Sequence, residues 1–596
     1  MEIAVDTETT GLHWTKGHQP FGIGIFAENW KSYHDCPVDF ETHKITGNFD
    51  NLKTFLENED KVIYFHNAKF DLHMLASVGI YPKGQIHDTM FMARICDNRE
   101  ANFQLKPLAK KYLEIPDDDE KDLKEAVLKT RKIYDIDSDY HELYWLPKYH
   151  DPENNLCEIY CLRDVERTYK LAMHYKKKMD TLGVRHTYDM EMALLPILSL
   201  MERTGIRFDR KKAEEKFLDL KLQLSKINFK LQKTYGDINF NSQQQVSTLL
   251  LMLGIPLTER TAASDRFPNG QLKAGAKVLA DFQDKSPICR TLVYRDKLAR
   301  SVTELLNYCE FEYAGVISPR TNQCHAVTWR FSQSDPNLMK TTKKQNQGSE
   351  FTLMRDLFGP REGYVWVAAD YEQIELRIFA DSSQEPHLLN AFRAGKDIHS
   401  ETTNRIPFLM EMAMEEGWEK ARSYGKNTNF TIINGGGASA LWKQYRIPEE
   451  QASKCIIGFK NAYPLAKEYM NLQTKQAKKT GFVTTKSKRR LFTDPKKPYT
   501  TAISYDIQPC AGDMMKQGLI NCYDWIMKNS CWNDIRILLS IHDELIFEIK
   551  KDIYDLEIVK ILKKLMELPC KIFCIPIPVN CDLIVNNWAE KEKIIL

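Results

Sequence analysis

Several features that would place a protein in a membrane, secreted or zinc-binding class are missing from this sequence. No run of eighteen or more apolar residues occurs, so no membrane span is predicted. No secretory signal peptide is expected either, because a candidate catalytic aspartate already lies at position 6. The fourteen cysteines are scattered, and the closest pairs, Cys157/Cys161 and Cys570/Cys574, lack the paired CxxC spacing of a zinc site. We therefore expect a cytoplasmic protein with buried, reduced thiols.

An excess of one charge is also missing, since the formal net charge is only +2. Nucleic-acid affinity depends on local clusters rather than on net charge, and basic clusters occur at 340–344 and 486–490. A basic run is more often a solvated surface, so these clusters alone do not establish a partner. No internal repeat or low-complexity tract is evident.

The length of 596 residues predicts roughly three or four domains or subdomains. Strand-like and helix-like segments alternate over the first 175 residues, which indicates an α/β domain, with a loop expected at the acidic run 117–122. Asp209 is expected to cap a long helix, and a second helical stretch is expected near 274–310. The first helix carries an apolar stripe at helical spacing, formed by Phe217, Leu220, Leu224, Ile227 and Leu231.

A first set of carboxylates begins in "IAVDTETTGL", where Asp6 and Glu8 follow an apolar strand and point to the same side of it. Asp71 in "HNAKFDLHML" and Asp164 in "YCLRDVERTY" follow later in the chain. Hydrolysis of a phosphodiester by two metal ions needs several hard oxygen ligands and an oriented water. We predict that the four carboxylates hold two Mg²⁺ ions and that the Tyr160 hydroxyl positions the attacking water.

At these residues the sequence resembles the DEDD-Y proofreading 3′→5′ exonucleases, whose motifs are DxE, Nx₂₋₃FD and Yx₃D. Any one motif is weak, but all three occur here intact and in order. "HDTMFMARI" at 87–95, an Asp-Thr pair entering a helix, also fits. The resemblance covers about residues 1–175 and implies an RNase H-like exonuclease domain.

A second pair of acids also lies beside strands: Asp370 follows "YVWVAA" and Asp543 precedes "LIFEI". Isolated acids near strands are more often structural. Brought together, these two could clamp two Mg²⁺ ions about 4 Å apart. One ion would lower the pKa of a primer 3′-hydroxyl, and the other would bind a nucleoside triphosphate and the leaving pyrophosphate.

Between these acids, Arg422, Lys426, Phe430 and Asn434 recur every four residues. On an α-helix this spacing drifts by only about 40° per step, so the four share one face. Two cations suit the phosphates of an incoming nucleotide, and the ring beyond them suits its base or sugar. The alternative is a salt-bridged surface helix, which leaves Phe430 poorly explained.

Over 185–596 the sequence resembles the family A DNA polymerases, of the DNA polymerase I type. Motif A is "DYEQIELR", motif B is "RSYGKNTNFTIING" and motif C is "IHDE". The whole chain is thus expected to be multidomain α/β and α+β, with the exonuclease domain followed by a right-hand polymerase domain. The resemblance implies a thumb at 185–310, a palm at 311–390 and 500–596, and fingers at 391–499.

The resemblance also implies roles for individual residues. Asp370 and Asp543 would hold the catalytic metals with Glu544 in a supporting acidic role, and Tyr371 would contribute to metal and nucleotide binding. Glu375 is similar to the steric gate that refuses a ribose 2′-hydroxyl.

Further roles concern the nucleotide and the primer. Arg422 and Lys426 would hold the triphosphate, with Lys426 donating a proton to pyrophosphate. Phe430 would pack on the nucleotide, and a Phe there implies discrimination against dideoxynucleotides. Residues near the primer terminus, which can check minor-groove acceptors common to all base pairs, would be Arg330, Gln508 and His542.

Four positions depart from the family pattern. Asn434 replaces the usual Tyr, which stacks near the template base. Met339, Thr500 and Ser504 stand where Gln, Arg and Asn are usual, so polar minor-groove contacts are lost. Because every predicted metal ligand remains, we interpret these changes as a modified fidelity check rather than a lost activity.

The expected substrates are primer-template DNA and dNTPs, and the expected cofactor is Mg²⁺, two ions per active site, with Mn²⁺ as a substitute. A monomer is expected, with a helicase, primase or single-strand-binding protein as replisome partners. The expected thumb segment shows no long insertion like the thioredoxin-binding one of some phage polymerases, and we expect no 5′-nuclease domain before the exonuclease. By analogy, this compact form predicts a bacteriophage replicative polymerase.

Three other functions make different predictions about these residues. A nuclease without synthesis would have lost Asp370, Asp543, Lys426 or Arg422, and a DNA-binding scaffold would need none of the acids. An RNA polymerase of related palm fold is disfavoured by Glu375.

Overall fold

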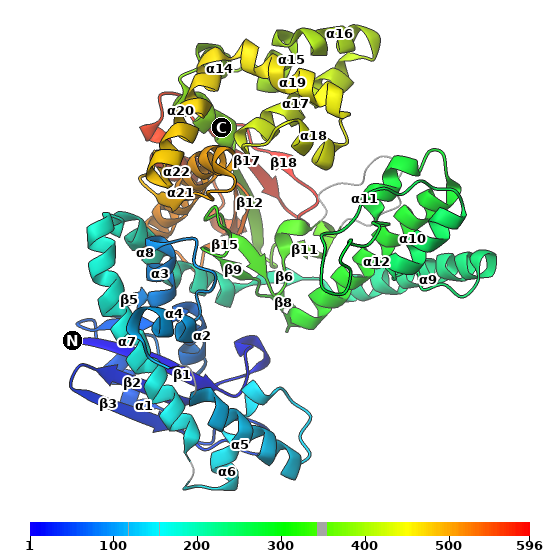
Figure 1. Ribbon diagram of the computed structural model, residues 1–596. Coiled ribbons are helices and arrows are strands. Elements are labelled where there is room, and N and C mark those ends of the chain that lie inside the picture. Colours follow the sequence, from blue (N-terminus) through cyan, green and yellow to red (C-terminus); the bar gives the residue numbers. More distant parts are fainter. Residues whose placement is uncertain (117–118, 154, 342–353) are drawn as a thin grey trace.

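The computed structural model describes residues 1–116, 119–153, 155–341 and 354–596, and two five-stranded sheets organise it (Figure 1). The N-terminal sheet has the strand order β3-β2-β1-β4-β5, in which β1, β2 and β3 are antiparallel and β4 and β5 continue in parallel. Its strands are β1 (Glu2–Thr9), β2 (Pro20–Ala27), β3 (Trp30–Asp35), β4 (Val62–Phe65) and β5 (Gln85–Asp88).

Helices cover this N-terminal sheet, and the longest of them crosses β1 and β2. They are α1 (Asp50–Leu56), α2 (Ala68–Ser77), α3 (Thr89–Cys96), α4 (Leu105–Leu113), α5 (Asp119–Ile133), α6 (Leu146–His150) and α7 (Leu156–Leu182). Gly24 in β2 allows the close approach of α7, since a Cβ there would lie 2.6 Å from the Cys161 sulfur. Asp88 caps α3 and accepts a hydrogen bond from the Met90 amide at 2.8 Å, as its Asp-Thr pair suggested.

The second sheet is fully antiparallel, with the order β15-β16-β12-β17-β18. Its strands are β12 (Tyr364–Tyr371), β15 (Ile535–Ile541), β16 (Glu544–Lys550), β17 (Val579–Ile584) and β18 (Glu592–Lys593). Its apolar side chains join the largest buried core with helices α8 (Arg185–Thr204), α13 (Ile374–Ser383), α21 (Pro498–Lys528) and α22 (Leu556–Glu567).

A helical arm projects from one side of this sheet (Figure 1). It contains α9 (Arg210–Tyr235), α10 (Gln243–Met252), α11 (Ala276–Leu279) and α12 (Pro287–Phe311). Asp209 caps α9 as predicted, because its carboxylate accepts a hydrogen bond from the Lys212 amide at 3.0 Å. A small sheet of order β11-β6-β8-β7 forms its base, from β6 (Ile206–Phe208), β7 (Glu312–Tyr313), β8 (Val316–Ile317) and β11 (Phe358–Gly359).

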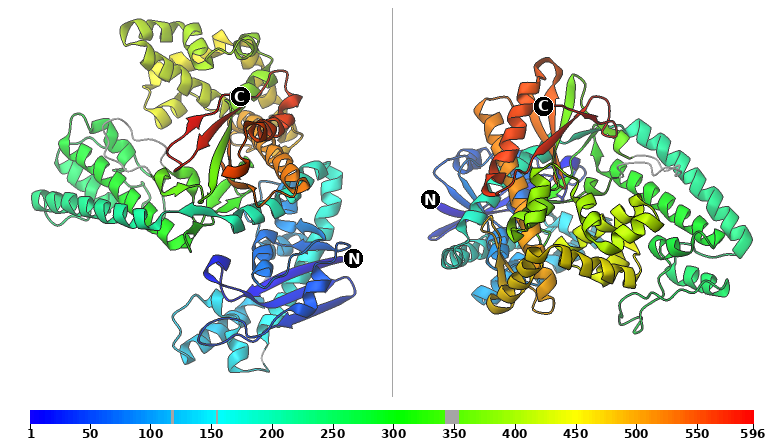
Figure 2. Two further views of the ribbon diagram at one scale, coloured as in Figure 1. Left: turned by 180° about the vertical axis from the view of Figure 1, so that it is seen from behind. Right: turned by 90° about the horizontal axis from the view of Figure 1, so that it is seen from above.

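A second helical group lies at the opposite end of the second sheet from the N-terminal sheet (Figures 1 and 2). It contains α14 (Pro386–Arg393), α15 (Ile398–Arg405), α16 (Pro407–Glu415), α17 (Trp418–Ile433), α18 (Ala438–Tyr445), α19 (Glu449–Ala462) and α20 (Pro464–Thr480). Two short hairpin ladders complete the fold: β9 (Arg320–Asn322) with β10 (Ser332–Ser334), and β13 (Phe482–Thr484) with β14 (Arg490–Phe492).

The two helical groups also contact each other. Arg446, just after α18, forms ion pairs with Glu259 at 2.6 Å and Asp281 at 3.3 Å on the arm. One guanidinium therefore bridges the two groups that flank the second sheet.

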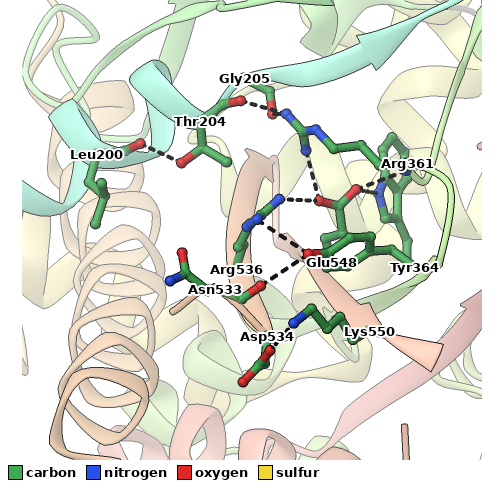
Figure 3. Close-up of polar contacts among 11 residues, drawn as sticks. Leu200, Thr204, Gly205, Arg361, Tyr364, Asn533, Asp534, Arg536, Glu548 and Lys550 are labelled. Atoms are coloured by element: carbon green, nitrogen blue, oxygen red, sulfur yellow. Dashed lines mark hydrogen bonds and ion pairs between the residues drawn. The ribbon is translucent and has the colours of Figure 1, made fainter. Parts of the chain in front are cut away.

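Buried Glu548 fixes the base of the arm to the second sheet (Figure 3). Its carboxylate accepts hydrogen bonds from the Arg361 guanidinium at 2.7 Å and from the Trp366 indole N–H at 3.1 Å. Arg361 in turn donates to the carbonyls of Thr204 and Gly205, at the end of α8. A buried carboxylate of this kind is tolerated because its oxygens have charged or N–H partners.

Some sequence expectations concern residues only partly described. Residues 117–118 of the expected acidic loop lie outside the described residues, and the loop prediction is wrong for 119–122, which form the first turn of α5. Of the basic cluster at 340–344, residues 342–344 lie outside the described residues. Eleven of the fourteen cysteines are buried, as predicted. Among the described residues, none of the helices is both long and apolar enough to cross a membrane.

Candidate functional sites

The first carboxylate cluster forms where β1, α2 and α7 meet. Asp6 and Glu8 lie on β1, Asp71 in the first turn of α2, and Asp164 on α7. The oxygens of Asp6 and Glu8 and the sulfur of Cys161 all lie within 4.8 Å of one another. The strand alternation thus places both β1 acids on one side, as expected.

Two further acids of this cluster are held by neighbours. One Asp71 oxygen accepts hydrogen bonds from the Thr7 amide at 3.1 Å and the Thr7 hydroxyl at 2.7 Å. Asp164 accepts from the Arg167 guanidinium at 2.7 Å. Tyr160, one turn before Asp164 on α7, is half-buried, and the Lys106 ammonium lies 4.3 Å from its ring centroid.

Burial and mutual repulsion oppose ionisation of these acids. Burial, followed by the charge of Asp164, raises the pKa of Asp6 to about 7. Burial and then the charge of Asp6 raise the pKa values of Glu8 and Asp71 well above the usual range. Several buried carboxylates that repel each other are a donor set suited to divalent cations, which would supply the missing positive charge.

The raised pKa of Asp6 gives a stability prediction for the protein without divalent cations. Its unfolded pKa is near 3.8 and its folded pKa is about 7, so between these values the folded state binds more protons. The free energy of unfolding should therefore fall as pH rises from about 4 to above 7, by about 1 kcal/mol or more. Thermal unfolding in EDTA at pH 5 and pH 8 measures this.

Added Mg²⁺ should restore stability at pH 8, since a ligand that binds only the folded state stabilises it. Asp6→Asn should flatten the pH dependence in EDTA. A metal-free protein that is equally stable at both pH values would contradict the prediction.

Sequence reasoning missed three contributors to this cluster: Cys161, Arg167 and Thr7. Cys161 directly follows Tyr160 in the Yx₃D motif, and Thr7 lies between the two β1 acids. The glycines of "FGIGI" were an available signal, because a β2 strand with two glycines indicates that a helix packs closely against it.

The second carboxylate cluster forms at one edge of the second sheet. Strands β12 and β16 pair antiparallel so that Asp370 lies opposite Glu544. The Tyr371 amide donates to the Asp543 carbonyl at 3.0 Å, which brings Asp543 beside the end of β12. His542 turns the chain between β15 and β16 with a left-handed φ of 57°. Two acids more than 170 residues apart in sequence thus meet at one turn.

The residues around Asp370 and Asp543 differ in exposure and in their contacts. Asp370 is exposed and Asp543 half-exposed, whereas Glu544 is buried and ion-paired with Lys591. The Tyr371 side chain points into the core, where its hydroxyl contacts the Met566 carbonyl. Only the backbone of Tyr371 is therefore available to the site.

Arg330 also reaches this cluster. It forms an ion pair with Glu375 in the first turn of α13. Burial lowers the pKa of the Arg330 guanidinium, and the charge of Asp543 partly offsets this effect. Neither the Lys591–Glu544 pair nor the Arg330–Glu375 pair could be inferred from sequence spacing.

The predicted helix face is present on α17. Arg422 donates to Asp397, the N-cap of α15, at 2.8 Å, and Lys426 is exposed. The Phe430 ring lies 5.6 Å from the His399 ring and packs against the main core. Phe430 is thus half-buried against the core and not exposed among polar residues.

Asn434 is the C-cap of α17 and not a further helical residue. The side-chain NH₂ group of Asn434 donates to the Phe430 carbonyl at 2.7 Å. The Gln508 side chain of α21 donates to the side-chain oxygen of Asn434. The next residue, Gly435, has a φ of 68°, and a Cβ there would lie 2.5 Å from the Thr500 carbonyl. The Ser504 hydroxyl donates to that same carbonyl at 2.8 Å, so the sequence departures at 434, 500 and 504 lie together.

Two family models match this chain. The model of DNA polymerase family A matches residues 210–590, and that of the 3′-5′ exonuclease matches residues 1–180. This chain belongs to the family A DNA polymerases. The predicted succession of an exonuclease domain and a polymerase domain is confirmed.

Relatives of this family A chain include bacterial DNA polymerase I proteins. That of Pseudomonas aeruginosa is 26% identical over 618 residues, covering 99% of this chain and 63% of the relative. The thermostable DNA polymerase I of Thermus aquaticus is 26% identical over 420 residues, covering 68% and 48%. The chain spans about three fifths of the length of the first of these relatives. These bacterial relatives leave the bacteriophage origin a prediction.

The fold of this family A chain is also similar to a solved structure, the POL domain of Pol1 from M. smegmatis in complex with DNA primer-template and dNTP. The TM-score is 0.78 at 22% sequence identity, over 98% of this chain and 95% of the other. At this identity, the likeness concerns the fold alone.

Proposed function

We propose that this chain extends a DNA primer with dNTPs at the second carboxylate cluster and removes mismatched 3′ ends at the first. The observation that supports this most is the pairing of β12 with β16, which brings Asp370 and Asp543 to one sheet edge. Two clusters on two different sheets fit two opposing reactions better than one divided site.

In the proposed synthesis, Asp370, Asp543 and the Tyr371 backbone would hold divalent cations, Mg²⁺ or Mn²⁺, with Glu544 held nearby by Lys591. The bound cations would acidify the primer 3′-hydroxyl and neutralise charge on the triphosphate. Arg330, Gln508 and His542 would contact the primer end, since Arg330 pairs with Glu375, Gln508 with Asn434, and His542 adjoins Asp543 in the chain.

The incoming nucleotide would bind along α17. Arg422 and Lys426 present two positive charges for its phosphates, and Lys426 is exposed and able to donate a proton to pyrophosphate. Phe430 supplies a flat surface beside the nucleotide, and Asn434 fixes the end of the helix through Gln508. Arg422 would exchange its Asp397 partner for phosphate.

In the proposed excision, Asp6, Glu8, Asp71 and Asp164 would hold the cations, and the Tyr160 hydroxyl would orient water toward the scissile phosphate. The hydrogen bonds from Thr7 and Arg167 fix the oxygens of Asp71 and Asp164. Such partners hold ligands in position and affect metal affinity.

A 5′-labelled primer with a mismatched 3′ end, annealed to a template, tests both reactions at once. With Mg²⁺ and all four dNTPs, we expect trimming by at least one nucleotide followed by full extension. A primer that only shortens would refute synthesis, and a primer that extends without trimming would refute excision.

Glu375→Ala is expected to raise ribonucleotide incorporation by about tenfold or more, because Glu375 would occupy the space needed by a 2′-hydroxyl. The measurement is the ratio of kcat/KM for a dNTP and the matching ribonucleotide. Glu375→Gln preserves the size of the side chain and serves as the matched control, so it should keep most of the selectivity. An unchanged ratio in Glu375→Ala would remove the steric-gate assignment.

A further inference from the structure

A cluster of buried charges lies between α8, α21 and the β13–β14 hairpin, and it shares no residue with either carboxylate site. Arg489 directly precedes β14 and donates to Asp513 at 2.8 Å and to Glu191 at 2.5 Å. Lys516 donates to the same Glu191 carboxylate at 2.6 Å. All four side chains are at most 2% exposed. Two positive and two negative charges are therefore fully paired in the interior.

This cluster contacts the segment 323–329, which leads to Arg330 at the proposed polymerase site. The Arg489 guanidinium lies 4.4 Å from the centroid of the buried Trp329 ring, and Lys516 donates to the Gln323 carbonyl at 2.9 Å. Trp329 has a left-handed φ of 56°, a conformation that bulky residues adopt only when their surroundings impose it. The next residue is Arg330, which pairs with Glu375.

The other side of the hairpin is attached to the exonuclease domain. The Phe492 amide donates to the Asn98 side chain at 2.7 Å, and the Asn98 amide donates back to the Phe492 carbonyl at 3.1 Å. The Arg99 guanidinium stacks 4.4 Å from the Phe492 ring centroid, and Leu491 joins the core of the N-terminal sheet. One hairpin thus contacts the exonuclease domain at 491–492 and Trp329 through Arg489.

Resting on the proposed function, we infer that Arg489 is a positioning residue. Its contact with Trp329 couples the hairpin, which is attached to the exonuclease domain, to the position of Arg330 at the primer terminus. A buried ion cluster adds little stability compared with apolar packing. In this one, Arg489 is held by ion pairs with both Glu191 and Asp513, which limits where its guanidinium can lie. A guanidinium that is both ion-paired and stacked fixes the Trp329 ring in two ways.

Asn98→Ala tests this inference without disturbing the buried charges. In an Asp6→Asn background that suppresses excision, we expect the rate of adding one matched nucleotide to fall by about three- to tenfold, with the KM for the dNTP unchanged. Asn102→Ala, on the exposed surface of the same domain, is the matched control and should have no effect. Thermal unfolding verifies that both variants fold.

A double-mutant cycle with Arg330→Ala supplies the decisive comparison. If the coupling passes through Arg330, Asn98→Ala should have no further effect once Arg330 is gone. Independent, multiplying effects would overturn the inference, as would an unchanged rate in Asn98→Ala. Arg489→Lys, which keeps the charge but not the stacked plane, should resemble Asn98→Ala. A parent protein that fails to extend any primer would instead refute the proposed function.

Discussion

Asp370→Asn is expected to reduce primer extension by about 10²–10³-fold or more, while 3′-end trimming by the same protein continues. The substitution keeps the shape of the side chain and removes the negative charge that Asp370 contributes to the second carboxylate cluster. Loss of one group that stabilises transition-state charge has effects of this size. Single-nucleotide extension and trimming are measured on the same labelled primer-template.

Asp552→Asn is the matched control, because Asp552 is an exposed acid beyond the far end of β16. It should leave both reactions unchanged. If Asp370→Asn abolished trimming as well in a folded protein, the assignment of two separate sites would be wrong.

Asp6→Asn is expected to have the reciprocal result: trimming falls by about 10²–10³-fold or more and extension of a matched primer is retained. Asp6 lies with Glu8 on β1, and after burial its charge contributes most to raising the pKa of Asp71. Replacing Asp6 by asparagine removes a carboxylate that would bind a cation, and it leaves no cavity because the two side chains are nearly the same size. The rate of shortening of a single-stranded, 5′-labelled oligonucleotide in Mg²⁺ measures the loss.

Asp60→Asn, an exposed acid in the same domain, is the matched control for this change. Its trimming rate should equal that of the parent protein. A residual trimming rate near normal in Asp6→Asn would place excision at another site.

The sequence predicted the acids and their strands well, because local patterns determine them. Strand alternation aligned Asp6 with Glu8, and the apolar runs beside Asp370 and Asp543 became the neighbouring strands β12 and β16. The four-residue spacing of Arg422, Lys426 and Phe430 likewise predicted correctly that they lie on one helix, α17.

Contacts between distant segments could not be predicted in this way. Lys591 reaches Glu544 across 47 positions, and Arg489 reaches Glu191 across 298. Nothing in the local pattern of a lysine or arginine specifies which carboxylate it meets, because the topology of the sheet decides this. The end of α17 was also missed, since Asn434 continues the four-residue spacing but adopts a capping conformation.

The strand order of the second sheet has a consequence for how this chain folds as it is synthesised. The N-terminal sheet uses strands that all lie before residue 89, and α7, which packs on it, ends at Leu182. By contrast, the two partners of β12 are β16 and β17, which end at residues 550 and 584. Domains generally fold in the order in which they leave the ribosome. The N-terminal domain can therefore fold long before the second sheet is complete. Until β16 and β17 have been synthesised, β12 remains an unpaired apolar strand, and such strands make a nascent chain prone to aggregation.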